Sequence, residues 1–303
     1  MASQMGKEGT FERPKAAQAQ EKPGLEKHMA PSSEATKLES SGTFVEYVGS
    51  GKLKDKKVLI TGGDSGIGRS VAALMAREGA DITITHLPEE KDDAEQTKKL
   101  VEQEKRSCHL ISVDLSKREN CKKVIDEHIS KFQKLNVLVN NASKQNMCKD
   151  FAQIDLDQVE STFQTNIIQM FALTKYALPH MSRGDSIINS TSVVAFRGTA
   201  GMVDYAATKG AIVSFTRALA QQLKPKGIRV NAVAPGPVYT PIQADTRQAE
   251  DMEDFGAKSS IGRPGQPSEV ATSFVFLASN EASLFFSHED TDGQVMHCYP
   301  LGD

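Results

Sequence analysis

The chain has 303 residues, of which 39% are hydrophobic, and its 36 basic and 39 acidic side chains leave a net charge of -3. This length suffices for one large α/β domain or two small ones with a substantial core. Neither sign of charge gathers into a long block, so the composition does not indicate a nucleic-acid partner. No run of about eighteen apolar residues exists, which argues against a membrane-spanning helix. Met1 to Ser40 lacks the apolar stretch of a secretory signal, and we expect a cytoplasmic protein.

The cysteine and histidine patterns do not indicate a metal site. The four cysteines show no C-x-x-C spacing, and the seven histidines form no H-x₃-H or HExxH arrangement. We therefore expect reduced thiols and no bound metal. The cysteines, which we interpret as small hydrophobes rather than nucleophiles, are Cys108, Cys121, Cys148 and Cys298.

Residues 1–50 are rich in Lys, Glu, Gln, Ala, Ser and Pro and carry few large apolar side chains. Such a composition cannot offset its ordering entropy alone, so we expect an extended N-terminal tail and a single domain over residues 51–303. The isolated apolar residues between Gln20 and Pro31 leave two alternatives open. The tail lies on a folded surface or a neighbouring subunit, or it is a disordered leader.

From Lys57 onward, short apolar runs alternate with amphipathic stretches, which is typical of a parallel sheet with crossover helices. The predicted strands are Val58–Thr61, Ile82–Thr85, His109–Val113, Val137–Asn140, Ser186–Asn189, Arg229–Ala234 and Gln294–His297. The predicted helices are Ile67–Glu78, Asp92–Lys105, Lys117–Phe132, Asp155–Pro179, Tyr205–Leu223 and Ser268–Ser279. The order predicts an α/β fold, a single Rossmann-type doubly wound parallel sheet with helices on both faces.

The glycine-rich run Thr61-Gly62-Gly63-Asp64-Ser65-Gly66-Ile67-Gly68 follows a predicted strand and opens a helix, which is the context of a dinucleotide fingerprint. Gly62 permits the tight turn, Gly66 lets the backbone approach a pyrophosphate, and Gly68 lets the helix pack on the sheet. Ser65 and Ile67 complete the predicted contacts at the helix N-terminus, which attracts phosphate. The alternative is an ordinary glycine-rich turn.

The end of the second strand, Thr85-His86-Leu87-Pro88, carries no acid placed to bind a ribose 2′-hydroxyl, as an NAD site prefers. This pattern favours NADP(H) over NAD(H). Ser65, His86 and Arg69 could help to bind a 2′-phosphate, although His86 could also be a solvated side chain.

Polar residues also follow the third and fourth strands. Asp114, with its neighbour Leu115, follows one strand, and Asn140-Asn141-Ala142 closes the other. Ligands bind at the carboxyl ends of strands in open α/β sheets, so contacts to adenine and to the nicotinamide ribose are predicted here. Alternatively, Asp114 caps the helix that begins near Lys117.

Tyr205 and Lys209 stand four residues apart in a predicted helix. Positions i and i+4 share one helix face, so a phenol and an ammonium at this spacing can point into one cleft. A nearby cation favours the phenolate and brings the tyrosine pKa down from about 10, which makes proton transfer at neutral pH plausible.

These motifs occur in an order that resembles the short-chain dehydrogenase/reductase superfamily over residues 53 to about 280. The resemblance is carried by the glycine-rich run, Asn140-Asn141-Ala142, Asn166, Ser192, Tyr205-x-x-x-Lys209 and Pro235-Gly236-Pro237-Val238-Tyr239-Thr240-Pro241. The segments Gly63-Asp64-Ser65, Asn141-Ala142-Ser143-Lys144-Gln145 and Pro23-Gly24 are similar to YghA-type aldehyde reductases and plant glucose/ribitol dehydrogenase-like proteins.

The resemblance implies hydride transfer between a nicotinamide and a small carbonyl or alcohol, in a homo-oligomer that is a tetramer or dimer. Tyr205 would act as general acid or base, and Ser192 would bind the substrate oxygen. Lys209 would hold the nicotinamide ribose and lower the tyrosine pKa, while Asn166 would anchor a water relay. In the segment beside the nicotinamide, the implied cofactor contacts are Pro235, Gly236, Val238 and Thr240.

Two departures from the family pattern affect these expectations. Ser143 replaces the usual glycine of Asn-Asn-Ala-Gly, which should leave cofactor binding intact. The stretch Ser283 to Pro300 differs from the usual end of the chain, so an insertion is expected to displace the last strand. Subunit assembly and substrate choice therefore do not follow from the resemblance.

Several alternative readings remain open. Ser192 could be a loop hydroxyl and Asn166 a locally bonded amide, and Gln243–Ile261 could be a mobile lid or a solvated helix. Tyr47, Tyr176, Tyr239 and Tyr299 lack a lysine partner and are interpreted as packing or rim residues. Besides a carbonyl reductase, the pattern allows an isomerase or dehydratase without net cofactor turnover and a non-catalytic cofactor-binding scaffold.

Overall fold

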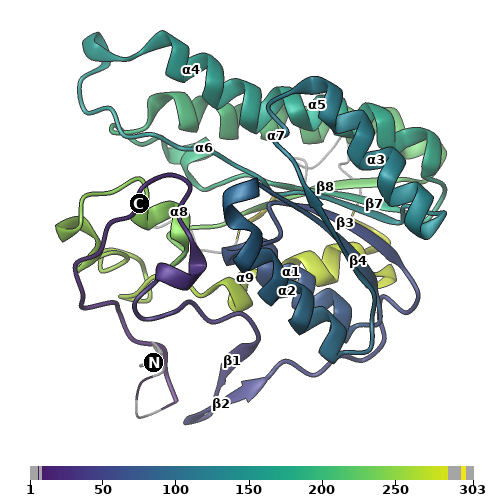
Figure 1. Cartoon of the computed structure of the whole chain (residues 1–303), viewed down its shortest axis with the longest axis horizontal. Coiled ribbons are helices and arrows are strands. Elements are labelled where there is room, and N and C mark those ends of the chain that lie inside the picture. Colours follow the sequence, from purple (N-terminus) through teal and green to yellow (C-terminus); the bar gives the residue numbers. More distant parts are fainter. Residues whose placement is uncertain (1–5, 7–8, 286–294, 298–303) are drawn as a thin grey trace.

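The computed structural model describes residues 6, 9–285 and 295–297. Its main feature is a parallel sheet of seven strands in the order β5-β4-β3-β6-β7-β8-β9 (Figure 1). The strands are β3 (Lys57–Thr61), β4 (Asp81–His86), β5 (Cys108–Ser112), β6 (Val137–Asn140), β7 (Ser186–Ser190), β8 (Arg229–Ala234) and β9 (Val295–His297). The strand order reverses between β3 and β6, which confirms the predicted doubly wound fold.

Helices cover both faces of the sheet. The longer ones are α1 (Gly66–Arg77), α2 (Lys91–Gln103), α3 (Arg118–Phe132), α4 (Leu156–Phe163), α5 (Gln169–Ala177), α7 (Val203–Leu223) and α9 (Pro267–Ala278). Helices α1, α2 and α9 lie on one side, and α3, α5 and α7 lie on the other (Figure 1). Short 3₁₀ turns are Glu26–His28, Pro88–Glu90, Phe151–Gln153, Leu178–His180, Lys224–Lys226, Glu250–Met252 and Asn280–Ala282.

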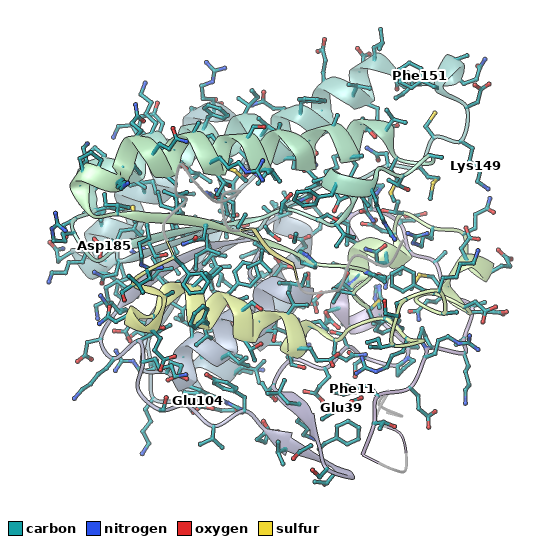
Figure 2. All side chains as sticks on the ribbon, turned by 180° about the vertical axis from the view of Figure 1, so that it is seen from behind. Phe11, Glu39, Glu104, Lys149, Phe151 and Asp185 are labelled. Atoms are coloured by element: carbon teal, nitrogen blue, oxygen red, sulfur yellow. The ribbon has the colours of Figure 1, made fainter. Side chains whose placement is uncertain are left out.

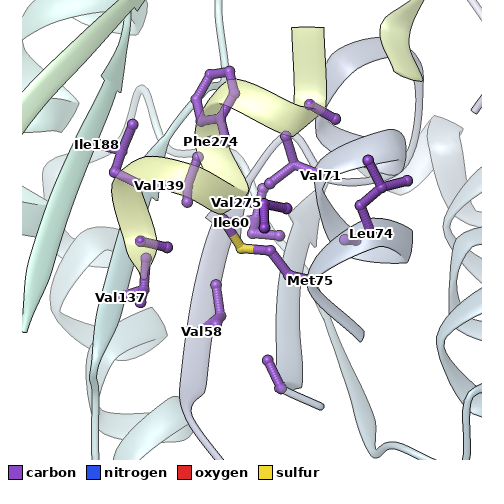
Figure 3. Close-up of a cluster of buried hydrophobic side chains, with 14 of the residues drawn as sticks. Val58, Ile60, Val71, Leu74, Met75, Val137, Val139, Ile188, Phe274 and Val275 are labelled. Atoms are coloured by element: carbon purple, nitrogen blue, oxygen red, sulfur yellow. The ribbon is translucent and has the colours of Figure 1, made fainter. Parts of the chain in front are cut away.

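The apolar runs of the strands are explained by burial on both faces. In β3, Val58 and Ile60 point into the core beneath α1 and α9, whereas Leu59 points into the core beneath α3. All three side chains are fully buried. Because successive side chains of a strand face opposite sides, a parallel sheet covered on both faces favours apolar residues on both sides of its strands. Figure 3 shows the first of these cores, in which Phe274 lies among strand and helix side chains.

The predicted helix Asp155–Pro179 is interrupted, so that prediction was wrong in its middle. Between α4 and α5, residues Gln164–Ile168 form a π-helical turn that carries Asn166. The hydrophobic periodicity of the segment gives no sign of this insertion. Its side-chain partners, described below, come from distant parts of the chain, and such turns often occur at functional sites.

Residues 9–50 lie against the domain instead of extending from it. They contain a short hairpin, β1 (Lys37–Ser40) and β2 (Thr43–Glu46), paired antiparallel. Figure 2 shows Phe11 beside Glu39, and the Phe11 backbone N–H donates to the Glu39 carboxylate. The Phe11 ring also packs on Phe44, with ring centroids 4.8 Å apart. The segment also contacts the domain, since the Gln266 side chain accepts from the Glu34 N–H at 2.9 Å and the Ser70 hydroxyl donates to the Ala35 carbonyl at 2.6 Å, so the structure shows packing on a folded surface.

At the other end of the chain, β9 pairs in parallel with β8, Val295 lying opposite Ala232. The predicted last strand is therefore present, at the edge of the sheet. Residues 286–294, which include Gln294 and most of the unusual C-terminal stretch, lie outside the described residues. The same holds for Cys298 and Tyr299. Of the other cysteines, Cys121 is buried, and Cys108 and Cys148 are partly buried.

The packing of α9 on the sheet predicts a large effect for one core substitution. Phe274 is fully buried, so Phe274→Ala should lower the free energy of unfolding by about 3–5 kcal/mol, measured by urea denaturation. Phe151 is 65% exposed and projects from the surface in Figure 2, so Phe151→Ala should change it by less than about 0.5 kcal/mol. Equal losses in the two variants would contradict this account of the core.

Candidate active site

One cavity of about 850 Å³ lies at the carboxyl ends of the central strands. In a doubly wound sheet this edge, next to the reversal of strand order, is where ligands bind. Every residue predicted for the site lines this cavity except Gly68 and Asn166. Residues from the ends of β3, β4, β7 and β8 and from α7 therefore come together although they are far apart in the sequence.

The glycine-rich loop is held in place by the residues that follow β6. The Thr61 hydroxyl accepts hydrogen bonds from the backbone N–H groups of Asn141 and Ala142, each at 3.0 Å. The Asn141 side-chain amide donates to the carbonyl oxygens of Thr61 and Gly62, at 3.1 and 2.9 Å. Asn141 thus fixes the shape of the loop as well as lining the cavity.

Two glycines in the loop are required by geometry. Gly66 has a φ of +48°, which side chains other than hydrogen rarely allow. Gly68 lies behind the cavity wall, where a Cβ atom would come within 1.9 Å of the Gly62 carbonyl oxygen. Only a residue without a side chain lets α1 start this close to the loop.

Tyr205 and Lys209 project from α7 toward the same region. The Lys209 ammonium lies 5.3 Å from the centroid of the Tyr205 ring. It is almost fully buried, at 2% exposure, and donates to the carbonyl oxygen of Ser190 at 2.9 Å. Ser192 follows β7 directly, and its hydroxyl donates to the Pro235 carbonyl at 3.4 Å. The shared helix face and the end of β7 thus bring phenol, ammonium and hydroxyl to one wall of the cavity.

The pKa of Tyr205 is shifted upward, whereas a downward shift was expected. Burial raises the pKa of Tyr205 to about 12, while a hydrogen bond with the Ser192 hydroxyl acts in the lowering direction. Burial also lowers the pKa of Lys209 to about 7. The expected downward shift of the phenol by the lysine is not found, because removal of both groups from water favours the neutral form of each.

Asn166 connects two walls of the site from outside the cavity. Its side-chain oxygen accepts from the Lys144 N–H at 2.7 Å, and its amide donates to the Lys144 carbonyl at 2.8 Å and the Thr208 hydroxyl at 3.0 Å. These partners are distant in sequence, so the interpretation of a locally bonded amide was wrong. Asn166 ties the loop after β6 to helix α7 beside Lys209.

Three residues were expected to help bind a 2′-phosphate near the end of β4, and the structure places them differently. Arg69 is buried and donates to the Asp64 carbonyl at 2.8 Å and to the Asp93 carbonyl at 3.1 Å, so it is occupied within the protein. His86 is 5% exposed and its Nδ1 bonds to the Leu87 carbonyl at 2.6 Å, which makes the solvated alternative wrong. Of the proposed set, Ser65 and His86 line the cavity.

Acidic residues near this end of the cavity were missed by the sequence analysis. Asp64, Glu89 and Glu90 all line the cavity. Burial and the neighbouring Asp64 raise the pKa of Glu90 to about 8, and burial raises the pKa of Asp64 to about 6. Glu89 and Glu90 lie in the short turn after β4 and not at the strand end, which is why the search for an acid there did not find them, and Asp64 comes from the glycine-rich loop after β3.

Asp114 does not cap the helix after it. Its carboxylate accepts from the Ser116 N–H at 2.9 Å, and α3 begins at Arg118 without a side-chain cap. The capping alternative is therefore wrong. Asp114 and Leu115 line the cavity at the end of β5.

Residues 243–261 were expected as a lid or a solvated helix. The segment contains a 3₁₀ turn at Glu250–Met252, and Met252 and Phe255 are buried against Met29 and Tyr239. The solvated-helix alternative is therefore wrong. Tyr239 is fully buried and Tyr47 bonds to the Glu78 carboxylate, so both are packing residues as predicted.

Further residues line the cavity without having been predicted. They include Lys22, Pro23 and Gly24 from the N-terminal segment, together with Arg197 and Arg247. Arg197 ends the short helix α6 (Val194–Arg197), and Arg247 follows α8 (Pro241–Ala244). The proline-glycine pair was the only signal in the sequence for the first group. Within the described residues, no cluster of His, Cys, Asp or Glu could hold a metal ion, and no helix is long and apolar enough to cross a membrane.

The buried lysine predicts a pH dependence of stability. The pKa of Lys209 is about 7 when folded against 10.5 for the free side chain, so between these values the unfolded chain binds the additional proton. The free energy of unfolding therefore gains a contribution that rises from about pH 7 toward pH 10.5. Lys209→Met removes this contribution. The free energy of unfolding of the variant minus that of the parent, measured by urea denaturation, should therefore fall as the pH rises through that range. Lys175 is exposed, so Lys175→Met should show the same pH dependence of stability as the parent. If Lys209→Met also showed the parent's pH dependence, the lowered pKa of Lys209 would be refuted.

The close approach at Gly68 predicts a binding defect. Gly68→Ala should displace the loop and raise the dissociation constant for a nicotinamide dinucleotide roughly tenfold or more, or about 1.4 kcal/mol, in a fluorescence titration. Gly210→Ala is the matched control, because a Cβ there meets nothing within 4 Å. Equal affinity of the two variants would show that the loop tolerates a side chain.

Comparison with known proteins agrees with this arrangement. The profile of a family described as enoyl-(acyl carrier protein) reductase matches residues 62–289. NADPH-dependent aldehyde reductase 1, chloroplastic, of Arabidopsis thaliana is 46% identical over 277 residues, which cover 89% of this chain and 94% of that protein. Glucose and ribitol dehydrogenase of Daucus carota is 45% identical over 83% of this chain and 86% of its own length.

Solved structures show the same fold. The crystal structure of a short chain dehydrogenase from Burkholderia cenocepacia J2315 in complex with NADP superposes with a TM-score of 0.74 at 28% sequence identity. The match covers 81% of this chain and 97% of that one. With the glycine-rich loop and the Ser192, Tyr205 and Lys209 wall in place, the chain belongs to the short-chain dehydrogenase/reductase superfamily of oxidoreductases.

Proposed function

We propose that this protein is an NADP(H)-dependent reductase of small aldehydes or ketones, which also oxidises the corresponding alcohols. The observation that carries the proposal is the meeting of Ser192, Tyr205 and Lys209 in the cavity that the glycine-rich loop borders. In this proposal the cofactor contacts are the predicted residues that line the cavity. Bound there, a nicotinamide would supply the hydride.

Tyr205 supplies the proton in the proposed reaction. Hydride addition to a carbonyl carbon puts negative charge on oxygen, which needs a hydrogen-bond donor and a proton together. With a pKa of about 12 the Tyr205 phenol holds its proton at neutral pH, in the form that reduction requires. Ser192 orients the substrate oxygen, and Lys209, with a pKa of about 7, can return a proton toward the phenol. The reductive direction fits these protonation states.

NADP(H) is proposed over NAD(H) because of the relatives and the charge near β4. The Arabidopsis relative is named as NADPH-dependent, and the Burkholderia structure contains NADP. Carboxylates beside the ribose would normally favour a free 2′-hydroxyl. The raised pKa of Glu90, about 8, however, reduces the negative charge that this carboxyl would present to a phosphate at neutral pH.

A homo-oligomer in the cytoplasm remains our proposal for the state of the protein. The surface of α5 and α7 supports association, because Phe171 is 53% exposed and packs against Phe215 with ring centroids 4.5 Å apart. Exposed aromatic pairs on adjoining helices are typical of subunit contacts. The Arabidopsis relative is named as chloroplastic.

The proposed function predicts nicotinamide oxidation that depends on one phenol. The purified protein should consume the absorbance of NADPH with small aldehydes, and more efficiently than that of NADH. Tyr205→Phe should lower kcat by about 10²- to 10⁴-fold, because it removes the proton donor. Tyr176→Phe, a tyrosine of the hydrophobic core beneath α3, should retain activity.

Two outcomes would contradict this proposal. Product formation without NADPH consumption would indicate the isomerase or dehydratase alternative. Tight dinucleotide binding without turnover of any carbonyl would indicate a cofactor-binding scaffold.

A further inference from the structure

We propose that residues 18–33 form a clasp that completes the active site, with Lys22 as a positioning residue. The clasp lies outside the family match, which begins at residue 62. It nevertheless contributes Lys22, Pro23 and Gly24 to the lining of the cavity. The inference deepens the proposed function and rests on it for the effect on catalysis, whereas the effect on the cavity walls can be measured without any ligand.

The first cavity wall that the clasp contacts is formed by the residues that follow the segment Pro235 to Pro241. The carboxylate of Asp245, just after α8, accepts from the Gly24 N–H at 2.9 Å and from the Lys22 ammonium at 3.0 Å. A Cβ on residue 24 would come within 2.5 Å of the Pro241 carbonyl oxygen, so only glycine allows this approach. The Asp245 side chain is 8% exposed and the Lys22 side chain 38%, so the carboxylate half of the ion pair is shielded from solvent.

The opposite wall is bound by the same ammonium. Lys22 Nζ donates to the Gln145 carbonyl oxygen at 2.7 Å, in the loop that follows Asn141 and Ala142. One side chain therefore bridges the loop after β6 and the segment after α8 across the cavity. The Lys22 ammonium therefore joins the two walls by charge-assisted hydrogen bonds.

The clasp also contacts the glycine-rich loop. The Glu26 carboxylate accepts from the Gly66 N–H at 2.9 Å and from the Ser33 hydroxyl at 2.6 Å. Glu26 is 4% exposed and does not line the cavity, so it supports the loop from behind. Its own N–H donates at 2.7 Å to Asp93, which also lies 3.4 Å from the Arg69 guanidinium.

A buried apolar contact holds the far end of the clasp. Met29 packs with Tyr239, Met252 and Phe255, and the Tyr239 hydroxyl donates to the Pro31 carbonyl at 2.9 Å. Tyr239 lies between Val238 and Thr240, both of which line the cavity. The clasp therefore supports this part of the wall from the outside.

Together these contacts reinforce direct ones between the walls, such as the hydrogen bond from the Gln145 side-chain amide to the Ile242 carbonyl at 3.1 Å and those of Asn141 to the glycine-rich loop. Ordering the loops of these walls on ligand binding costs conformational entropy, and contacts formed beforehand reduce that cost. We therefore assign to the clasp the preorganisation of the cavity, with Lys22 as the bridge. Loss of the bridge should weaken dinucleotide binding and raise KM while leaving proton transfer at Tyr205 intact.

The test compares two lysines of the same segment in the full chain. Lys22→Met should raise the dissociation constant for NADPH and the KM for an aldehyde roughly tenfold, with kcat changed less than about twofold. Lys22→Arg should restore most of the affinity, because a guanidinium can bridge the same oxygens. Lys27→Met is the matched control, since Lys27 pairs only at the surface with Asp92, at 2.7 Å, and should behave as the parent.

A second measurement needs no ligand and no activity. Hydrogen exchange of the backbone amides of residues 240–247 should be faster in Lys22→Met and in Asp245→Asn than in Lys27→Met. Unchanged exchange and unchanged NADPH affinity in the first two variants would overturn the clasp. A fall of kcat in parallel with thermal stability would do the same, since it would indicate a merely structural role. If the parent reduces no carbonyl, the proposed function fails while the exchange result still decides the clasp.

Discussion

The burial of the central strands on both faces is the constraint on which the structure depends. Val58 and Ile60 of β3 enter one core and Leu59 enters the other, and all are excluded from water. No polar side chain can stand there without losing hydration. Chemistry is therefore confined to the strand ends, and the reversal of order between β3 and β6 opens a cavity there.

The cavity wall formed by α7 contains two side chains, Lys209 and Tyr205, whose charged forms are costly to bury. Lys209 is 2% exposed, with its ammonium on the Ser190 carbonyl, and its pKa falls to about 7. Tyr205 keeps its proton for the same physical reason. Perturbed pKa values of this kind gather at functional sites, where stability is given up for a defined protonation state. The rigid strand ends and the π-helical turn at Gln164–Ile168 hold these groups despite that cost.

The superfamily core and the N-terminal segment contribute differently to this site. The family match begins at residue 62, and the Burkholderia structure is covered over 97% of its length by 81% of this chain. The core carries the glycine-rich loop and the cavity wall that contains Tyr205. The clasp, residues 18–33, adds further contacts between walls that the core joins through Gln145 and Asn141.

Local patterns in the sequence determined the elements and the list of chemical groups. Runs such as Val58-Leu59-Ile60 and the spacing of Tyr205 and Lys209 predict strands and a shared helix face, because both depend only on backbone periodicity. The predicted strands agree with the structure within one residue at each end. Long-range contacts decided the rest. Partners distant in the chain decide three features: the π-helical turn at Asn166, the placement of Glu90 and the docking of Lys22. The direction in which the Tyr205 pKa shifts depends on burial, which no local sequence pattern records.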